Sequence, residues 1–366
     1  MTDPSHRCAS RRAWLGGGVA RRPLLGSALL IAAALTWTLP AAAEPTLGTT
    51  RRIAPGLYEL VVSDTPKQVY VASAGDRGKD NARILALDPA TLEPRGAIEL
   101  GGDPAFGLAI NNRTGMIYTT NTRDGSVSAI SVRDNRVVAT IKPDSDGKRQ
   151  VRQVLVDPDH DRAYVSAFAR EGDAAIWVVD TKANKVERMI TADLGPGITG
   201  LALDAAGNRL FATALTTNEV VEIDLSKGAV ARRFPSGGEG SINIAFDAAR
   251  RHLIVANQKS GGVTVLDATD GKLLRTVETG AGALSVTVDA PRNRVFVANR
   301  GAGTVTVLDA DSLAVLATLA TGTHPNTVAV DAATGIAYVS NKAATGPRGA
   351  PPVDDPKGDT VSVIRP

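Results

Sequence analysis

Aromatic, cationic and amide side chains recur at one place in this sequence, where successive apolar, strand-like runs begin. Tyr58 and Phe106 open two of these runs, Arg152 opens a third, and Asn243 and Asn326 stand near the start of two more. Rings stack on flat ligands, a guanidinium binds an anion, and amides read polar edges. This combination predicts a site for a planar or anionic ligand. The alternative for the two aromatic residues is packing between structural units.

A second group of cations stands in the loops that follow other strand-like runs. Arg123, Lys259, Arg300 and Lys342 each come one or two residues after an asparagine. If these loops converge, the cations form a positive ring that attracts anions. The alternative is that they are solvated turn residues, since acidic residues share the same loops.

No catalytic spacing accompanies these residues. His324 is the one candidate general base, but no Asp or nucleophile is tied to it by spacing, and a lone histidine is more often a structural hydrogen-bonding residue. His160 and His252 fall in short turns, so a three-histidine metal site is not expected. We therefore expect a binding protein that is not an enzyme, with no catalytic residue, no metal and no cofactor.

Seven copies of one pattern, from Leu57 to the C-terminus, provide the elements that position these residues. Each copy has an apolar run, a turn, a second strand with a large apolar marker and a third strand. The markers are separated by 48, 46, 47, 43, 42 and 42 residues, and they are Tyr70, Tyr118, Tyr164, Phe211, Ile254, Phe296 and Tyr338. Short strands repeating at this period predict an all-β fold, a seven-bladed β-propeller of four-stranded antiparallel blades.

The seventh copy ends at Thr360–Ile364 and lacks a fourth strand. We predict that the N-terminal segment Thr50–Ile53 completes this blade, which would hide two sheet edges and lock the ring. The loops then fall into two sets, of which the turns between first and second strands are short and alike. The variable loops share the other rim, and function is expected there. One of them, Lys342–Asp359, is rich in Pro and Gly and is interpreted as either a flap or an insertion without regular structure.

Residues 1–43 are predicted to be a cleaved export signal. Five arginines precede the apolar stretch Leu24–Leu39, and Ala41–Ala43 offers a small-residue cleavage site. The competing reading is a membrane anchor, but the apolar stretch is short and no stop-transfer pattern follows. We therefore expect a periplasmic protein with no membrane contact, and residues 44–366 as a single propeller domain.

Removal of this signal changes the composition. The leader carries five Arg and one Asp, so 36 basic residues face 37 acidic residues in the remainder. The basic isoelectric point belongs to the leader, and overall charge does not favour nucleic acid or a membrane surface as a partner. Cys8, the single cysteine, is removed as well, which excludes disulfides, covalent haem and a cysteine nucleophile.

Words within the repeats resemble those of a known family. Tyr118–Asn121, Phe296–Asn299 and Tyr338–Asn341 are similar to the YVTN repeat of bacterial propellers. Thr199–Asp204 and Thr323–Asn326 are similar to longer words of the YncE-like family of periplasmic seven-bladed propellers, and the likeness spans residues 52 to 366.

The resemblance implies a periplasmic propeller that is not an enzyme and for which single-stranded DNA binding at the funnel has been proposed. It would give the funnel residues a nucleic-acid role, whereas the residues themselves also suit a small anionic ligand or a protein partner. Two other hypotheses come from different classes. YVTN-type propellers resemble sugar lactonases, which would make the chain a hydrolase, and a third hypothesis is a scaffold subunit of a redox enzyme.

Overall fold

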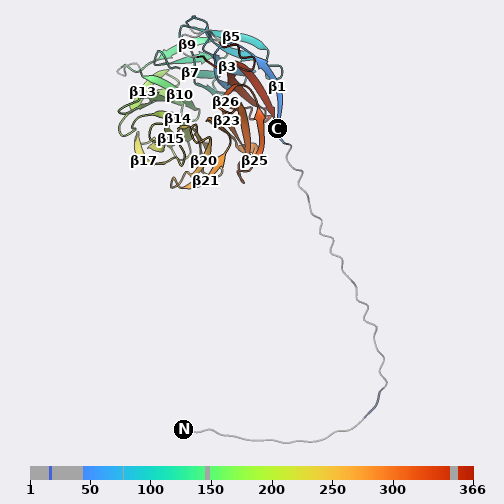
Figure 1. Ribbon diagram of the computed structural model, residues 1–366. Helices are drawn as coiled ribbons and strands as arrows, with labels where there is room; N and C mark the ends of the chain where they lie inside the picture. The colour runs from blue at the N-terminus through green and yellow to red at the C-terminus, as the bar shows by residue number, and fades with distance from the viewer. Residues whose placement is uncertain (1–15, 19–43, 77, 145–148, 347–352) are drawn as a thin grey trace, which may run out of the picture. The chain divides into compact units, whose positions relative to one another are not determined.

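The computed structural model describes residues 16–18, 44–76, 78–144, 149–346 and 353–366. The chain divides into two units, Met1–Ala42 and Ala43–Pro366. In the first unit, residues 16–18 form no helix or strand, and the rest of the predicted leader with its cleavage site lies outside the described residues. The second unit is a ring of small sheets, which the colours of Figure 1 follow in chain order from blue to red.

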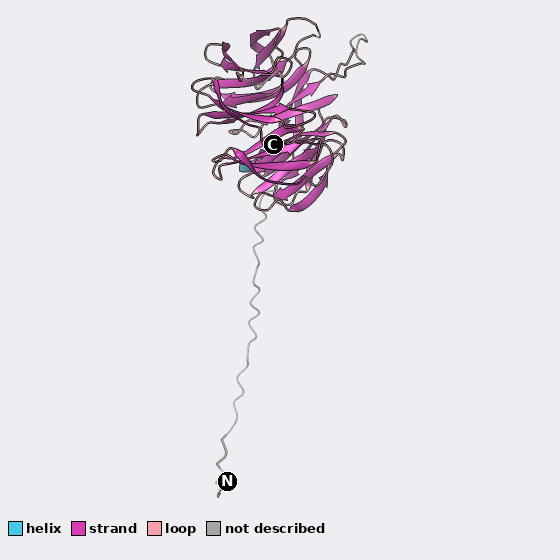
Figure 2. Cartoon of the chain, turned by 90° about the vertical axis from the view of Figure 1, so that its left-hand side faces the viewer, coloured by secondary structure: helices cyan, strands magenta, loops and turns pink. Residues whose placement is uncertain are grey.

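Each blade is a four-stranded antiparallel sheet, and strands dominate the fold (Figure 2). The first blade contains β2 (Leu57–Asp64), β3 (Lys67–Ser73), β4 (Ala82–Leu87) and β5 (Pro94–Gly101). The second blade contains β6 (Leu108–Asn111), β7 (Met116–Asn121), β8 (Ser126–Ser131) and β9 (Arg136–Ile141). The third blade contains β10 (Gln150–Asp157), β11 (Arg162–Phe168), β12 (Ala175–Asp180) and β13 (Lys185–Ile190).

Three further blades follow the same order, with one short 3-10 helix in a turn. The fourth blade contains β14 (Ile198–Asp204), β15 (Arg209–Ala214), β16 (Glu219–Asp224) and β17 (Ala229–Pro235). The fifth blade contains β18 (Ser241–Asp247), β19 (His252–Asn257), β20 (Gly262–Asp267) and β21 (Leu273–Glu278). The sixth blade contains β22 (Ala283–Asp289), η1 (Ala290–Arg292), β23 (Arg294–Asn299), β24 (Thr304–Asp309) and β25 (Val315–Ala320).

The seventh blade closes the ring with both ends of the chain. Its strand order is β1 (Thr46–Arg52), β28 (Thr360–Arg365), β27 (Ala337–Lys342) and β26 (His324–Val330). Thr50 lies opposite Ser362, and their hydroxyls are hydrogen-bonded at 2.8 Å. The seven-bladed architecture and the N-terminal closing strand are thus confirmed, and this strand begins four residues before the predicted segment.

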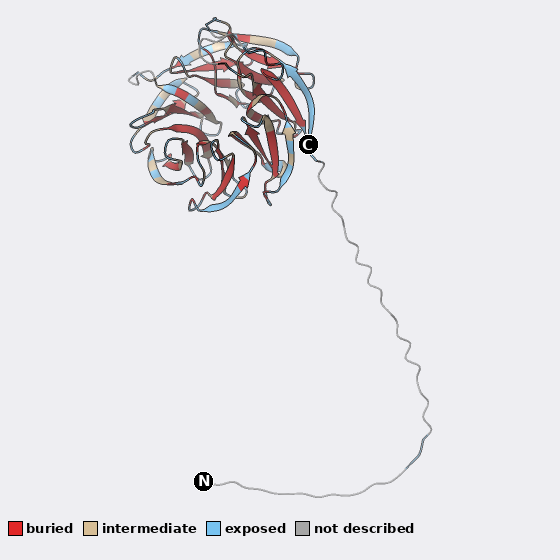
Figure 3. Ribbon diagram, in the orientation of Figure 1, coloured by how far each residue is buried: buried red, intermediate tan, exposed pale blue. Residues whose placement is uncertain are grey.

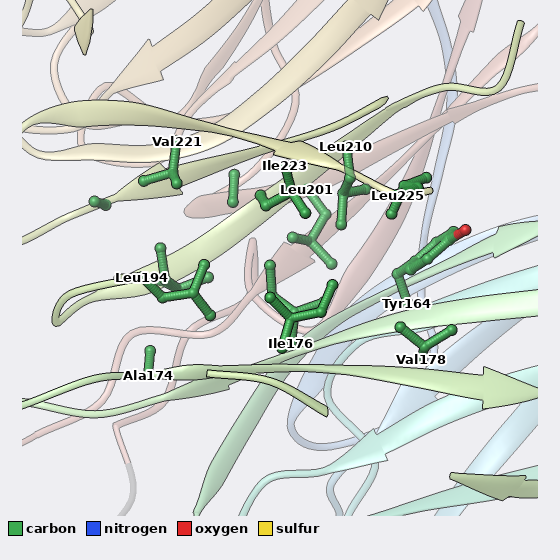
Figure 4. Close-up of a cluster of buried hydrophobic side chains, with 14 residues drawn as sticks. Tyr164, Ala174, Ile176, Val178, Leu194, Leu201, Leu210, Val221, Ile223 and Leu225 are labelled. Carbon is green, nitrogen blue, oxygen red and sulfur yellow. The ribbon is translucent and has the colours of Figure 1, made fainter. Parts of the chain in front are cut away.

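The core lies between neighbouring blades, because the second and third strands of a blade are covered on both faces. Tyr164 and Ile176 of the third blade pack against Leu201 and Leu210 of the fourth, as Figure 4 shows. Six other apolar clusters repeat this arrangement around the ring. The outermost strands are exposed along one side, which gives the pale outer rim of Figure 3. Face-to-face packing of sheets therefore holds the ring together.

Beyond Lys342, which ends β27, the described part of the Lys342–Asp359 excursion contains no helix or strand, but two buried carboxylates anchor it. Asp359 Oδ1 accepts hydrogen bonds from the backbone N–H groups of Leu57 and Ala343, each at 3.2 Å. Asp355 accepts from Thr323 Oγ1 at 2.7 Å and from the Ala344 N–H at 2.9 Å. These contacts join the last blade to the start of the first.

Candidate functional site

A cavity of about 240 Å³ lies on the axis of the ring, because every blade contributes to its lining. The lining comes from the beginnings of the inner strands. It consists of Tyr58, Glu59, Phe106, Gly107, Thr122, Arg152, Gln153, Thr199, Gly200, Ile242, Asn243, Leu284, Ser285, Asn326 and Thr327.

Two consecutive positions of the repeat supply nearly all of these residues. The first position is occupied by Tyr58, Phe106, Arg152, Thr199, Ile242, Leu284 and Asn326, whose separations match those of the second-strand markers. The second position is occupied by Glu59, Gly107, Gln153, Gly200, Asn243, Ser285 and Thr327. The repeat therefore builds the cavity as two rings of side chains.

A register shift explains how two neighbours on a strand reach the same cavity. The pairing of β2 with β3 shifts between Leu57 and Leu60, which flank Tyr58 and Glu59. Corresponding shifts occur in blades three to seven. A β-bulge interrupts the alternation of side chains and re-aims them, so both residues turn toward the axis.

Hydroxyl groups on the second strands hold this irregular backbone. Thr120 Oγ1 accepts the Gly107 N–H at 2.9 Å and donates to the Arg152 carbonyl of the next blade at 2.7 Å. Ser166 does the same, accepting the Gln153 N–H at 3.0 Å and donating to the Thr199 carbonyl at 2.7 Å. Each hydroxyl thus satisfies an amide at the start of an inner strand and ties two blades together.

The mouth of the cavity combines aromatic rings with cations. The Tyr58 and Phe106 rings meet edge to face with centroids 4.4 Å apart. Arg123 Cζ lies 5.9 Å from the Phe106 centroid, and Lys342 Nζ lies 3.5 Å from the Tyr58 centroid and donates to its hydroxyl. Tyr58 also packs against the apolar cluster between blades one and two, so its predicted packing role is confirmed, and the residue lines the cavity as well.

Two arginines complete the mouth. Arg152 Nη2 donates to Gln150 Oε1 at 3.1 Å, and Arg300 Nη1 donates to Asn326 Oδ1 at 3.1 Å. Desolvation lowers the pKa of both guanidinium groups, and the nearby Tyr58 partly offsets the effect. The Arg152 side chain is exposed at the mouth, and its guanidinium lies over the Phe168 ring, with Cζ 5.0 Å from the ring centroid.

One residue further along the inner strands, polar side chains of the first, third and fifth blades each bond to the next blade. Glu59 Oε2 accepts the Leu108 N–H of the second blade at 2.9 Å. Gln153 Oε1 accepts the Leu201 N–H at 2.7 Å, and Asn243 Oδ1 accepts the Val286 N–H at 3.1 Å. The pKa of Glu59 is raised to about 7, chiefly because the carboxyl is desolvated, while the bond from Leu108 acts in the opposite direction.

The structure brings most, but not all, of the predicted site residues together. Tyr58, Phe106, Arg152, Asn243 and Asn326 line the cavity, and Arg123 and Arg300 border it through the contacts above. Lys259 is exposed and His324 is partly buried, and neither lines the cavity. Rim position alone does not fix how far a loop residue lies from the axis.

Glu59 is the ionisable cavity residue that sequence reasoning missed. Strict alternation along β2 sends Glu59 to the face opposite Tyr58, and the register shift overrides that expectation. A signal was nevertheless present, because the same repeat position is polar or glycine in all seven copies and an apolar residue always follows it.

Groups suited to acid–base or metal chemistry are sparse. In the described ranges no cluster of three or more His, Cys, Asp or Glu side chains could hold a metal ion. His324 Nδ1 is buried without a hydrogen-bond partner, and no described carboxylate bonds to this ring. No helix within the described part is long and apolar enough to cross a membrane.

Comparison with known proteins agrees with this architecture. The YNCE-like beta-propeller family matches residues 67–345. The chain is 33% identical over 266 residues to the uncharacterized protein YncE of Escherichia coli strain K12, covering 69% of this chain and 72% of that protein. It is 31% identical over 265 residues to the uncharacterized protein YncE of Salmonella typhi, with the same shares covered.

A solved structure, the Kuenenia stuttgartiensis hydrazine synthase, superposes with a TM-score of 0.65 at 17% identity. The match covers 80% of this chain and 95% of that chain. Likeness at this identity concerns the fold alone. The profile match and the E. coli relative together establish that the chain belongs to the YNCE-like β-propeller family.

Proposed function

We propose that this chain is a non-enzymatic binding protein that takes up a ligand with an anionic group and a planar ring at the mouth of the axial cavity. The observation that carries the proposal is that Arg152 and Arg300 form no salt bridge with a described residue, although desolvation lowers the pKa of both guanidinium groups. On the opposite rim, Arg209, Arg250 and Arg292 each pair with a buried Asp. Guanidinium groups that bond only to amide oxygens and have no carboxylate partner are suited to bind a carboxylate or phosphate.

The aromatic pair and the cavity size support the planar part of the ligand. Tyr58 and Phe106 place ring edges and faces beside the cations. Small-molecule sites commonly measure about 300–1,000 Å³, and the 240 Å³ of this cavity suits a single ring better than a long segment of polymer. A free nucleotide and one base of single-stranded DNA share this chemistry, and we propose that class of ligand.

We also propose that the protein works in the periplasm after removal of residues 1–43, on the strength of its arginine-rich, apolar leader. Fractionation of cells with mass spectrometry of the purified protein tests this. An N-terminus near Glu44 in the periplasmic fraction is expected, and an intact leader on cytoplasmic protein would contradict it.

Equilibrium binding tests the proposed ligand class. Fluorescein-labelled oligo-dT and thymidine monophosphate are titrated with purified protein across a salt series. The wild type is expected to bind both, and its affinity for oligo-dT is expected to fall linearly in log salt. A stronger response to oligo-dT than to the mononucleotide would identify DNA as the source, and the reverse would identify a small ligand.

Matched variants locate the site. The double variant Arg152→Ala, Arg300→Ala removes the two unpaired guanidinium groups and is expected to weaken binding at least tenfold, since each charge-assisted hydrogen bond contributes about 1.5–3 kcal/mol. Lys259→Ala removes a cation from the same rim outside the cavity and is the control. Equal effects of both variants would refute the site, and turnover of a lactone or phosphate ester that is lost in Arg152→Ala would refute the non-enzymatic assignment.

A further inference from the structure

The inner part of the cavity carries polar side chains whose orientation is fixed by the blades. We call Glu59, Gln153, Asn243 and Ser285 the funnel floor, because they stand one residue further along the inner strands than the mouth residues. Backbone amides of neighbouring blades occupy Glu59 Oε2, Gln153 Oε1 and Asn243 Oδ1. When a backbone N–H group binds the oxygen of a side-chain amide, the amide nitrogen is the end that remains available to a ligand.

Several polar atoms of the funnel floor are left for a ligand. Gln153 Oε1 also accepts a long bond of 3.5 Å from Asn243 Nδ2, so the Gln153 amide nitrogen is the end turned away from this network. That nitrogen, Glu59 Oε1 and Ser285 Oγ have no hydrogen-bond partner among the described residues. None of these three atoms is fully buried, so solvent or a ligand in the cavity can reach each of them.

The floor differs from the mouth in charge. The ionisable cavity-lining residues are Tyr58, Glu59 and Arg152, and no cation contributes to the pKa of Glu59, which desolvation raises to about 7. Arg123, Arg300 and Lys342 cluster instead around Phe106, Asn326 and Tyr58 at the mouth. A partly buried, desolvated carboxyl without a counter-cation favours its neutral form.

The elements packed against β2 add few other ionisable groups. Strand β26 carries His324 and β27 ends at Lys342, while β6 carries none. On β3, Lys67 pairs with Asp331 and the Tyr70 hydroxyl bonds to Gln68, both toward the opposite rim. His324 is therefore the histidine on an element packed against β2, and a variant of it serves as a control.

We propose that Glu59 determines which ligands this site accepts: as a neutral acid it donates a hydrogen bond to a carbonyl on the edge of the ligand ring, and the Gln153 amide, which lines the same cavity, is a second donor. The inference rests on the proposed function, since it assumes that the ring enters the cavity while the anion stays at the mouth. A ring with two carbonyl acceptors, such as the C2 and C4 carbonyls of thymine, offers one acceptor to each donor. Binding then holds the proton on Glu59, because an ionised carboxylate would face acceptor oxygens and lose the bond.

Binding of oligo-dT as a function of pH tests this directly, because its phosphodiesters do not titrate near neutrality. The wild-type affinity is expected to be constant below about pH 6 and to fall roughly tenfold per pH unit above about pH 7. Glu59→Gln imitates the neutral acid and keeps an acceptor for the Leu108 N–H. This variant is expected to bind at every pH about as tightly as the wild type binds at low pH.

Two control variants isolate Glu59. Glu239→Gln changes an exposed carboxyl on the same rim outside the cavity, and His324→Gln removes the imidazole carried by β26. Both are expected to retain the wild-type pH dependence. Calorimetry of the wild type in two buffers of different ionisation enthalpy supplies a readout without mutation, and uptake of about one proton per ligand is expected near pH 8.

The outcomes separate the inference from the proposed function. Binding that is flat from about pH 5.5 to 8.5, or equally pH-dependent in Glu59→Gln, overturns the role of Glu59 and leaves the ligand site standing. Loss of the pH dependence in the His324→Gln variant would overturn the role of Glu59 as well. Absence of oligo-dT binding at every pH removes both proposals for this ligand class.

Discussion

The rings of Tyr58 and Phe106 meet edge to face across the boundary between the first two blades, with centroids 4.4 Å apart and planes inclined at 72°. The two residues are 48 positions apart in the sequence, which is one repeat. Each ring also contacts a cation, Lys342 at Tyr58 and Arg123 at Phe106. Neighbouring repeats thus place their aromatic residues beside the positive groups that an anionic, planar ligand requires.

Phe106→Ala should weaken binding of a planar ligand without abolishing attraction of anions. Loss of a stacking partner costs about 1–3 kcal/mol per base, which corresponds to roughly 5- to 150-fold in affinity. Titration of the variant with thymidine monophosphate and with inorganic pyrophosphate checks this. Affinity for the mononucleotide is expected to fall and affinity for pyrophosphate to stay, so an equal loss for both ligands would contradict the stacking role.

Glu59→Gln should stabilise the fold at alkaline pH. The folded-state pKa of Glu59, about 7, exceeds the ordinary value of 4.5, so the folded state binds more protons between these values and wild-type stability falls as pH rises through this window. The variant escapes this loss. Its gain in free energy of unfolding should be near zero at about pH 4.5 and about 2–3 kcal/mol at pH 8.

Urea unfolding of wild type and Glu59→Gln at both pH values measures this difference. Glu239→Gln, which alters an exposed carboxyl, should show a stability difference that does not change with pH. A Glu59→Gln variant that is equally or less stable at pH 8 would show that the carboxyl is better solvated than the geometry indicates.

Gly200→Ala should destabilise the propeller because the blades approach closely there. A methyl group at this position would lie 2.6 Å from Asn243 Cα and 2.9 Å from the Ile242 carbonyl oxygen, both backbone atoms. We expect a loss of about 1–3 kcal/mol, typical of overpacking. Gly96→Ala, where no atom lies within 4 Å of the added methyl, serves as control in denaturant unfolding, and equal stability of the two variants would argue against the close approach.

Asp359→Ala should weaken closure of the ring. Its carboxylate accepts the N–H groups of Leu57 in the first blade and Ala343 in the seventh, and its loss leaves both without this acceptor. Unsatisfied buried donors cost about 1–3 kcal/mol each. Hydrogen exchange should accelerate first in β1 and β28, whereas the exposed Asp354→Ala variant should behave like wild type. Uniform acceleration over all blades would contradict a local clasp.

The blade count and the closing strand could be predicted because both depend on repeat spacing and on the strand missing after Thr360–Ile364. The composition of the cavity could be predicted only in part. Tyr58 and Arg152 were found from their position at the start of an inner strand, but Glu59 required knowledge of a register shift. Such shifts depend on hydrogen bonds from hydroxyls such as Ser166 to a neighbouring blade, which alternation along one strand does not reveal.

Photo-crosslinking tests the central claim most directly, because it locates the bound ring on the protein. Oligo-dT with 4-thiothymidine is bound to the wild-type protein at low salt, irradiated, and the modified peptides are identified by mass spectrometry. Crosslinks at Tyr58 or Phe106, suppressed by excess unlabelled oligo-dT and reduced in the Arg152→Ala, Arg300→Ala variant, are the predicted result. Crosslinks confined to the outer strands or to the opposite rim, and unaffected by that variant, would contradict an axial ligand site.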